Sequence, residues 1–279
     1  MTKSLRNLIT LILVAICLFS IGQLIRQRQD QKSQTQIYED AIVLAQAAEV
    51  NPTEAPVTEA TEPPAPTETQ PPEIQWIPAP LEEADENMDK LATIDLNALR
   101  QTNPDVVGWI YIPNSRINYP LMQGEDNTFY LERTWEGSLN AYGSIFLESR
   151  NSPDFTDFNT IIYGHNMLDG SMFGGLSNYA AQWFWEWNRY IYILTDAGIF
   201  RYEIFASYFA PIDSPTYGLS FYQLKTREDF IAHALESSQI DTGITPAVTD
   251  RIITLSTCTG MGYESRRVVQ AYLKMIPVE

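Results

Sequence analysis

Short runs of apolar and β-branched residues, separated by glycine, proline and asparagine, dominate the chain beyond residue 105. They predict eight strands: 106–112, 118–122, 144–147, 160–163, 190–195, 200–208, 252–257 and 267–275. Eight short strands within about 175 residues are typical of a single sandwich or barrel and not of an alternating parallel α/β sheet. The pattern therefore predicts a mainly β fold.

Two segments carry helical signals. Residues spaced to form one apolar face predict a helix that Thr226 caps: Phe230, Ile231, Ala234 and Leu235. Asp95 is placed to cap a short helix that ends before Pro104. We therefore expect short helical insertions in the β fold.

The N-terminal region has a different pattern. Residues 7–25 form a stretch of 19 residues without a charge, about the length that crosses a bilayer as a helix. Lys3 and Arg6 precede it, as the positive-inside rule requires, and no signal-peptidase site follows it closely. We expect a single-pass protein of the cell membrane, with a cytoplasmic N-terminus at 1–6 and the remaining chain outside.

Three further regions follow this predicted anchor. Residues 26–50 form a juxtamembrane segment whose alanine-rich part can be helical. Residues 51–80 hold nine prolines, five glutamates and no lysine or arginine, which predicts a disordered, extended stalk. Residues 81–279 form the folded domain. The net charge of −17 argues against a nucleic-acid partner, because phosphates require a basic surface.

The chain has two cysteines, and Cys17 lies within the apolar stretch. Cys258 closes the β-branched run 252–257, and it has no disulfide partner in the part expected outside the cell. Two interpretations of Cys258 stay open, a small buried apolar residue and a reactive thiol. With two histidines besides, the chain offers no metal-ligand cluster, and we expect neither metal nor cofactor.

The two histidines differ in position. His233 lies on the predicted helix away from its apolar face, so we expect a solvated side chain. His165 follows a buried strand and Gly164, at the entry to a loop. A residue in this position is held firmly while its side chain stays accessible, which suits an acid or base, although a loop histidine that only bonds its neighbours fits equally well.

Arg266 opens the last strand, and a short turn after Cys258 would bring the two side by side. A guanidinium there could favour the thiolate and hydrogen-bond the oxyanion that forms when a thiolate attacks a carbonyl. Arg266 and Arg267 could equally be edge charges that oppose aggregation. Spacing alone does not decide between these interpretations.

At this point the residues resemble the sortases, most closely class B. The segment 163–167, Tyr-Gly-His-Asn-Met, is similar to the histidine signature of that class. The segment 254–259, Thr-Leu-Ser-Thr-Cys-Thr, is similar to its cysteine signature, and Arg266 before Val268 and Val269 to its arginine strand. The resemblance covers about residues 90 to 275, in order.

The resemblance implies a closed sortase-type β-barrel of about eight strands and a cysteine transpeptidase of mostly Gram-positive bacteria. Cys258 would attack the threonine carbonyl of a sorting motif, of the Asn-Pro-x-Thr type, and form a thioacyl enzyme. His165 would protonate the departing amine and deprotonate the incoming one. Arg266 would stabilise the oxyanion, with Arg267 as the alternate arginine.

The resemblance also implies partners and a binding surface. The partners would be the sorting-motif peptide of a secreted surface protein and an amine of a peptidoglycan precursor. Substrate-binding residues would be Ser256, Thr257, Asn166, Tyr217 and Tyr222. Three alternatives stay open: a pilin-polymerising sortase, a hydrolytic cysteine peptidase with the same dyad, and a surface adhesin or scaffold without activity.

Overall fold

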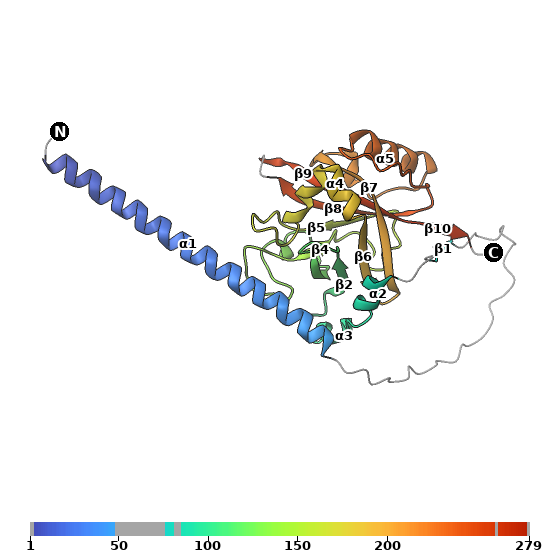
Figure 1. Cartoon of the computed structure of the whole chain (residues 1–279), viewed down its shortest axis with the longest axis horizontal. Coiled ribbons are helices and arrows are strands. Elements are labelled where there is room, and N and C mark those ends of the chain that lie inside the picture. The colour runs from blue at the N-terminus through green and yellow to red at the C-terminus, as the bar shows by residue number, and fades with distance from the viewer. Residues whose placement is uncertain (1–2, 48–75, 81–84, 260–261, 278–279) are drawn as a thin grey trace.

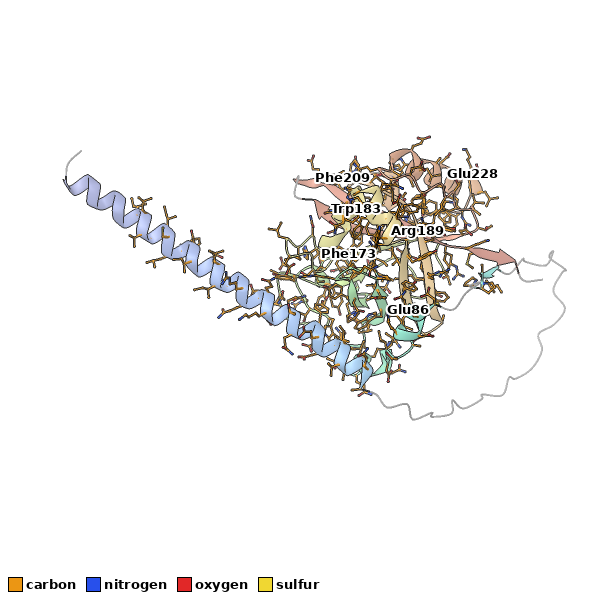
Figure 2. All side chains as sticks on the ribbon, in the orientation of Figure 1. Glu86, Phe173, Trp183, Arg189, Phe209 and Glu228 are labelled. Atoms are coloured by element: carbon orange, nitrogen blue, oxygen red, sulfur yellow. The ribbon has the colours of Figure 1, made fainter. Side chains whose placement is uncertain are left out.

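A computed structural model describes residues 3–47, 76–80, 85–259 and 262–277 of the chain (Figure 1). Its main body is a β-barrel, and a long helix, α1 (Lys3–Gln46), lies against one side of it and extends far beyond it. One face of the second half of α1 is buried against the rest of the protein, whereas the side chains of residues 12–26 are exposed (Figure 2). The barrel positions the candidate site.

Within the described residues, eight strands close into the barrel. They are β2 (Val106–Tyr111), β3 (Asn118–Met122), β4 (Ile145–Leu147), β5 (Asn159–Tyr163), β6 (Tyr190–Thr195), β7 (Gly198–Pro211), β8 (Arg251–Thr259) and β9 (Gly262–Leu273). Each corresponds to one predicted strand, which confirms the mainly β, closed-barrel fold. The strands β7, β8 and β9 are each longer than the runs that predict them.

The strand order around the barrel is β2-β3-β4-β5-β8-β9-β7-β6. The pairs β3–β4 and β5–β8 are parallel and the other pairs are antiparallel. Because β5 and β8 are parallel, a long connection joins them, and it carries β6, β7 and helix α5 (Leu224–Ser237). The strand that ends in Cys258 therefore lies between β5 and β9.

The barrel interior is filled by large apolar side chains, among them Trp109, Ile193 and Leu255, each fully buried. A second cluster lies under α5, where Phe230 and Ile231 are buried as predicted. Burying each of these side chains contributes about 1.5–3 kcal/mol. Strands β7 and β9 contribute buried residues to both clusters.

The helix termini test the predicted caps. The Asp95 carboxylate accepts hydrogen bonds from Asn97 N and Ala98 N and caps α3 (Leu96–Arg100), which confirms that prediction. Thr226 does not cap α5, because the helix begins two residues earlier and the Thr226 hydroxyl donates to Gln223 O. A second short helix, α2 (Glu86–Leu91), is capped by Asp85.

The remaining helical turns lie in the connections. They are η1 (Phe129–Leu131), η2 (Gly174–Ala180), α4 (Gln182–Trp187) and η3 (Pro215–Tyr217). Most of the predicted stalk lies outside the described residues. Its last part is ordered, because β1 (Trp76–Pro78) pairs antiparallel with β10 (Met275–Pro277).

The predicted single-pass membrane location is contradicted. In the part of the chain that the structure describes, no helix combines the length and the apolar character needed to cross a bilayer. Residues 7–25, the predicted anchor, belong to α1, and this helix runs on without a break into a segment that carries Arg26, Arg28 and Lys32.

Candidate active site

The ends of β5 and β8 carry two of the predicted site residues. Tyr163 in β5 is paired with Ser256 in β8, and Gly164 N donates to Ser256 O over 3.2 Å. His165 and Cys258 each come two residues after this pair. Because parallel strands advance in step, the two residues arrive at the same end of the barrel on neighbouring strands.

Strand β9 brings the third residue to the same place. The Cα register of β8 and β9 pairs Cys258 with Arg266, directly before an irregularity at Thr259. The side chain of Cys258 lies outside the described part of the structure. The backbone alone therefore places Cys258 between His165 on one side and Arg266 on the other.

The two arginines at the start of the final apolar run differ in their surroundings. The side chain of Arg267 is buried, and its Nη1 donates to Gln239 Oε1 over 2.6 Å. Its guanidinium stacks on the Phe209 ring, with Cζ 3.9 Å from the centroid, and burial lowers its pKa. Arg266 is half-buried and alternates with Arg267 along β9. Only Arg266 shares a register position with Cys258.

The ring of His165 is fixed by a backbone carbonyl. Its Nε2 lies 2.6 Å from Leu131 O, and since a carbonyl can only accept, Nε2 carries the proton in this contact. The other ring nitrogen, Nδ1, is then the one that can exchange a proton. Asn166, the next residue, forms a backbone bridge with Met172 across the following loop.

The predicted substrate-binding residues do not all lie together. The Tyr217 hydroxyl lies 3.0 Å from the buried Ser256 hydroxyl, so these two residues meet two positions before Cys258. Thr257 is buried on the alternate face of β8, where its Oγ1 has no hydrogen-bond partner among the described residues. Tyr222 is 96% exposed. The structure brings Ser256 and Tyr217 together and leaves Thr257 on the other face.

A buried polar network fixes the η3 turn that carries Tyr217. The Tyr208 hydroxyl bonds Thr216 Oγ1 at 2.9 Å and donates to Gln270 Oε1 at 3.1 Å. Gln270 donates to Thr254 Oγ1, and Thr254 donates to Asn159 Oδ1. The Asn159 amide closes the network by donating to Thr216 O. A fully satisfied buried network of this kind holds the turn in a single position.

His233 is not the solvated side chain that the sequence predicts. It is half-buried, and its Nε2 lies 3.2 Å from Ser214 Oγ, beside the Tyr208 ring. The η3 turn covers this part of α5. The sequence pattern of one helix cannot predict that a distant turn packs on it.

A buried carboxylate, missed by the sequence, lies beside Tyr163. Both Asn127 Nδ2, at 2.7 Å, and the Tyr163 hydroxyl, at 3.1 Å, donate to Glu148 Oε2. Arg150 Nε donates to Oε1 over 2.6 Å. Burial alone would raise the pKa of Glu148, but these hydrogen bonds outweigh it and hold the pKa below its usual value. Asn127 and Tyr163 lie 21 and 15 residues from Glu148 in the sequence, so no local motif indicates this cluster.

Glu148→Gln should lower stability at pH 7 and have little effect at acidic pH. A carboxyl whose pKa is lowered by folding stabilises the native state above its unfolded pKa, and this contribution is lost as the pH falls through the folded pKa. Urea unfolding of both proteins at pH 7 and near pH 3 measures the difference. Asp196→Asn, at an exposed ion pair with Arg100, is the control and should change little at either pH. An equal deficit of Glu148→Gln at both pH values would contradict the assignment.

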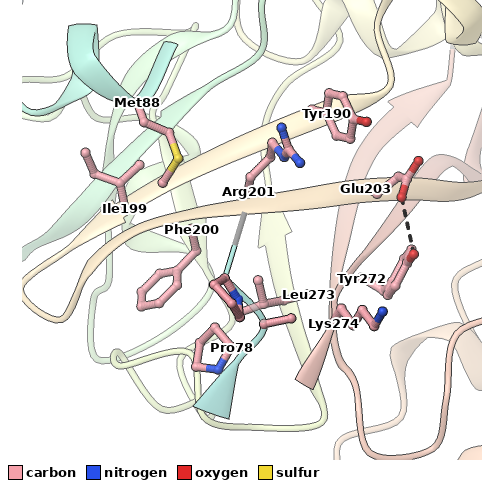
Figure 3. A pocket seen from close by; sticks show the side chains of 12 residues that line it. Pro78, Met88, Tyr190, Ile199, Phe200, Arg201, Glu203, Tyr272, Leu273 and Lys274 are labelled. Atoms are coloured by element: carbon pink, nitrogen blue, oxygen red, sulfur yellow. Dashed lines mark hydrogen bonds between the residues drawn. The ribbon is translucent and has the colours of Figure 1, made fainter. Parts of the chain in front are cut away.

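A cavity outside the candidate site is lined by residues of β6, β7 and β9, among others (Figure 3). It has a volume of about 630 Å³, and the Tyr272 hydroxyl donates to Glu203 Oε2 across its wall. Leu273, which lines it, pairs with Arg251 at the start of β8. Cys258 lies seven residues after Arg251 along β8, which corresponds to roughly 23 Å at the usual rise per residue of a strand. This cavity is not part of the candidate active site.

Comparison with known proteins identifies relatives in sequence and in structure. The family model for the sortase domain matches residues 110–274. Sortase B of Listeria monocytogenes is 37% identical over 176 residues, which cover 63% of this chain and 72% of the relative. The solved Staphylococcus aureus sortase B–substrate complex is 30% identical, with a TM-score of 0.62, over 70% of this chain and 91% of that one.

A further sortase B structure, solved in complex with triglycine, has the same identity of 30% and the same TM-score of 0.62. The alignment covers 70% of this chain and 92% of that structure. The chain belongs to the sortase family, whose members are cysteine transpeptidases. Within that family its relatives place it in class B.

Proposed function

We propose that Cys258 is the nucleophile of this transpeptidase and that it cleaves a C-terminal sorting motif of secreted proteins. The observation that carries the proposal is the meeting of Cys258, His165 and Arg266 on the neighbouring strand ends of β5, β8 and β9. An Asn-Pro-x-Thr type of motif is proposed from the class B resemblance. The acceptor is an amine of a cell-wall precursor.

The first half-reaction forms a thioester. The Cys258 thiolate attacks the threonine carbonyl carbon, and the carbonyl oxygen becomes an oxyanion to which Arg266 donates. The carbon–nitrogen bond then breaks as Nδ1 of protonated His165 gives its proton to the departing amine. Nε2 stays bonded to Leu131 O throughout, which keeps the ring in one orientation. The product is a thioacyl enzyme and a free C-terminal fragment.

The second half-reaction transfers the acyl group. An incoming amine attacks the thioester carbon, and neutral His165 accepts its proton at Nδ1. The intermediate collapses, the carbon–sulfur bond breaks and the Cys258 thiolate is restored. The sortase B solved with a substrate and the one solved with triglycine support a peptide donor and an amine acceptor.

The binding surface for the motif includes Ser256 and Tyr217. Their hydroxyls are 3.0 Å apart and lie two positions before the nucleophile, where an acyl-donor peptide that extends along β8 must pass. Asn166 borders the same end of the barrel through the loop after His165. Thr257, which lies on the alternate face, supports the strand instead of contacting the peptide.

The acceptor decides between this function and a hydrolytic peptidase with the same dyad. A sorting-motif peptide incubated with the enzyme and triglycine should give mostly ligated product, and the ligated fraction should rise with triglycine concentration. Mass spectrometry of the products measures it, with triglycine acetylated at its amine as the control. A product that is only the free acid at all triglycine concentrations would indicate a peptidase. Ligation to a pilin lysine in preference to triglycine would indicate a pilin-polymerising enzyme.

A further inference from the structure

The second half of α1 is docked on the two segments that hold His165. Its buried residues recur at helical spacing and form one face: Gln34, Tyr38, Ala41 and Ala45. Two of these four are polar and long. A helix that only covered apolar surface would bury apolar side chains here. The polar groups of Gln34 and Tyr38 are buried instead, and buried polar groups require hydrogen-bond partners.

One set of contacts reaches the loop that follows His165. Gln31 Nε2 donates to Asp169 Oδ2 over 2.8 Å. The other oxygen of Asp169 accepts from Ser171 N, at 3.0 Å, and from Ser171 Oγ, at 2.6 Å. Partial burial alone would raise the pKa of Asp169, but the hydrogen bonds from Ser171 and Gln31 hold it below its usual value. A charged Asp169 thus ties the turn of the loop to α1.

The same loop closes back onto the backbone of His165. Phe173 N donates to His165 O over 2.9 Å. The preceding residue, Met172, has a backbone φ of 51°, a value that is unfavourable for residues other than glycine. Met172 N donates to the Tyr119 hydroxyl, and the Tyr119 ring packs edge-on against Tyr38 of α1, with centroids 4.9 Å apart. A strained turn of this kind persists only while its surroundings hold it.

A second set of contacts reaches Gly143, which packs against the carbonyl of Leu131 that fixes the imidazole. Both the Tyr38 hydroxyl, at 3.1 Å, and Gln34 Nε2, at 3.3 Å, donate to Gly143 O. Gly143 lies so close to Leu131 that a Cβ at residue 143 would collide with Leu131 O. Leu131 O is the oxygen that contacts His165 Nε2. A displacement of Gly143 is therefore transmitted to the ring.

We propose that Gln31 and Tyr38 of α1 are positioning residues for His165. Gln31 acts through the loop backbone after the histidine, and Tyr38 acts through Gly143 and Leu131 on the ring. The inference rests on the proposed acid–base role of His165. It makes activity depend on a helix that contributes no residue to the strand ends where Cys258 and Arg266 meet.

Substitutions at Gln31 test the first route. Gln31→Ala should lower kcat about tenfold and leave KM for the sorting peptide unchanged, because a small displacement of an acid–base group slows the chemical step without removing substrate contacts. Gln31→Lys keeps a donor for Asp169 and should restore activity. Gln31→Glu places two carboxylates together and should be slower than Gln31→Ala. Gln36→Ala is the matched control, because Gln36 is exposed and its Nε2 donates to Asp40 Oδ1 of the same helix.

Tyr38→Phe tests the second route, since it retains the ring against Tyr119 and removes only the hydroxyl; it should likewise lower kcat and not KM. Hydrogen exchange followed by mass spectrometry gives a readout besides activity. Amides of 165–173 should exchange at least about tenfold faster in Gln31→Ala than in Gln36→Ala, while amides of β8 stay unchanged.

Two results would overturn the inference. One is that Gln31→Ala and Tyr38→Phe have the same kcat and the same loop exchange as Gln36→Ala. The other is that the activities of the three variants at residue 31 do not decrease in the order Gln31→Lys, Gln31→Ala, Gln31→Glu. Failure of the proposed function is separate from both. It would appear as undiminished activity in His165→Ala, in which case the exchange of 165–173 still reports whether α1 holds the loop.

Discussion

Cys258→Ala should reduce transpeptidation by at least about 10⁴-fold, since no other group can form the thioester on which both half-reactions depend. The backbone of β8 is held by its pairing with β5 over residues 252–256 and with β9 over residues 251–259, and neither pairing depends on this side chain. The variant should therefore fold normally. Release of the C-terminal fragment from a sorting peptide measures the rate, and the mass of the intact protein shows whether an acyl enzyme forms.

Cys17 gives a matched control for this experiment. It is the other cysteine of the chain, exposed on α1. Cys17→Ala should keep the wild-type rate and should still acquire the mass of the acyl group. If Cys258→Ala released the fragment at the wild-type rate, Cys258 would not be the nucleophile, whatever the fold of the chain.

The barrel could be predicted from sequence because its strands are encoded locally. A run such as 252–257 combines β-branched residues with flanking turns, and burial on both faces keeps nearly every position apolar or small. The first residues of β9 could not be predicted in this way. Ser265 and Arg266 are polar, and they are extended because their backbone pairs with Pro211 and Ala210 of β7.

The N-terminal region shows where composition misleads. Residues 7–25 and 26–46 differ in hydrophobicity, so the sequence divides them into an anchor and a juxtamembrane segment. Backbone hydrogen bonding does not follow that division, and a single helix, α1, spans both. Its docked face became visible only in the structure, because Gln34 and Tyr38 are buried by partners more than a hundred residues away.

The candidate site divides in a similar way. Cys258, His165 and Arg266 could be proposed from local signatures, because each is flanked by residues that resemble a family pattern. Leu131 could not be predicted from the sequence, because it contacts His165 through a backbone carbonyl that any residue would supply. The Glu148 cluster could not be either, because its members come from separate loops and strands and meet only when the barrel closes.

Arg266→Lys and Arg267→Lys should have opposite consequences. Arg266→Lys should lower kcat/KM by about 10²–10³-fold, as expected when a preorganised donor to an oxyanion is lost, because lysine keeps the charge and loses the planar set of donors. Stability should change little. The register that pairs residue 266 with Cys258 is the reason for this assignment. Peptide kinetics and urea unfolding of the same preparations separate the two effects.

Arg267→Lys should instead destabilise the fold by about 1–3 kcal/mol and leave kcat/KM within about threefold of wild type. Its guanidinium is stacked on Phe209 and donates to Gln239 in a buried position, a geometry that an ammonium cannot reproduce. If Arg267→Lys lost activity at normal stability and Arg266→Lys remained active, Arg267 would be the residue that acts at the oxyanion. Because neighbouring residues of one strand face opposite sides, only one of the two guanidiniums can reach a peptide held at Cys258.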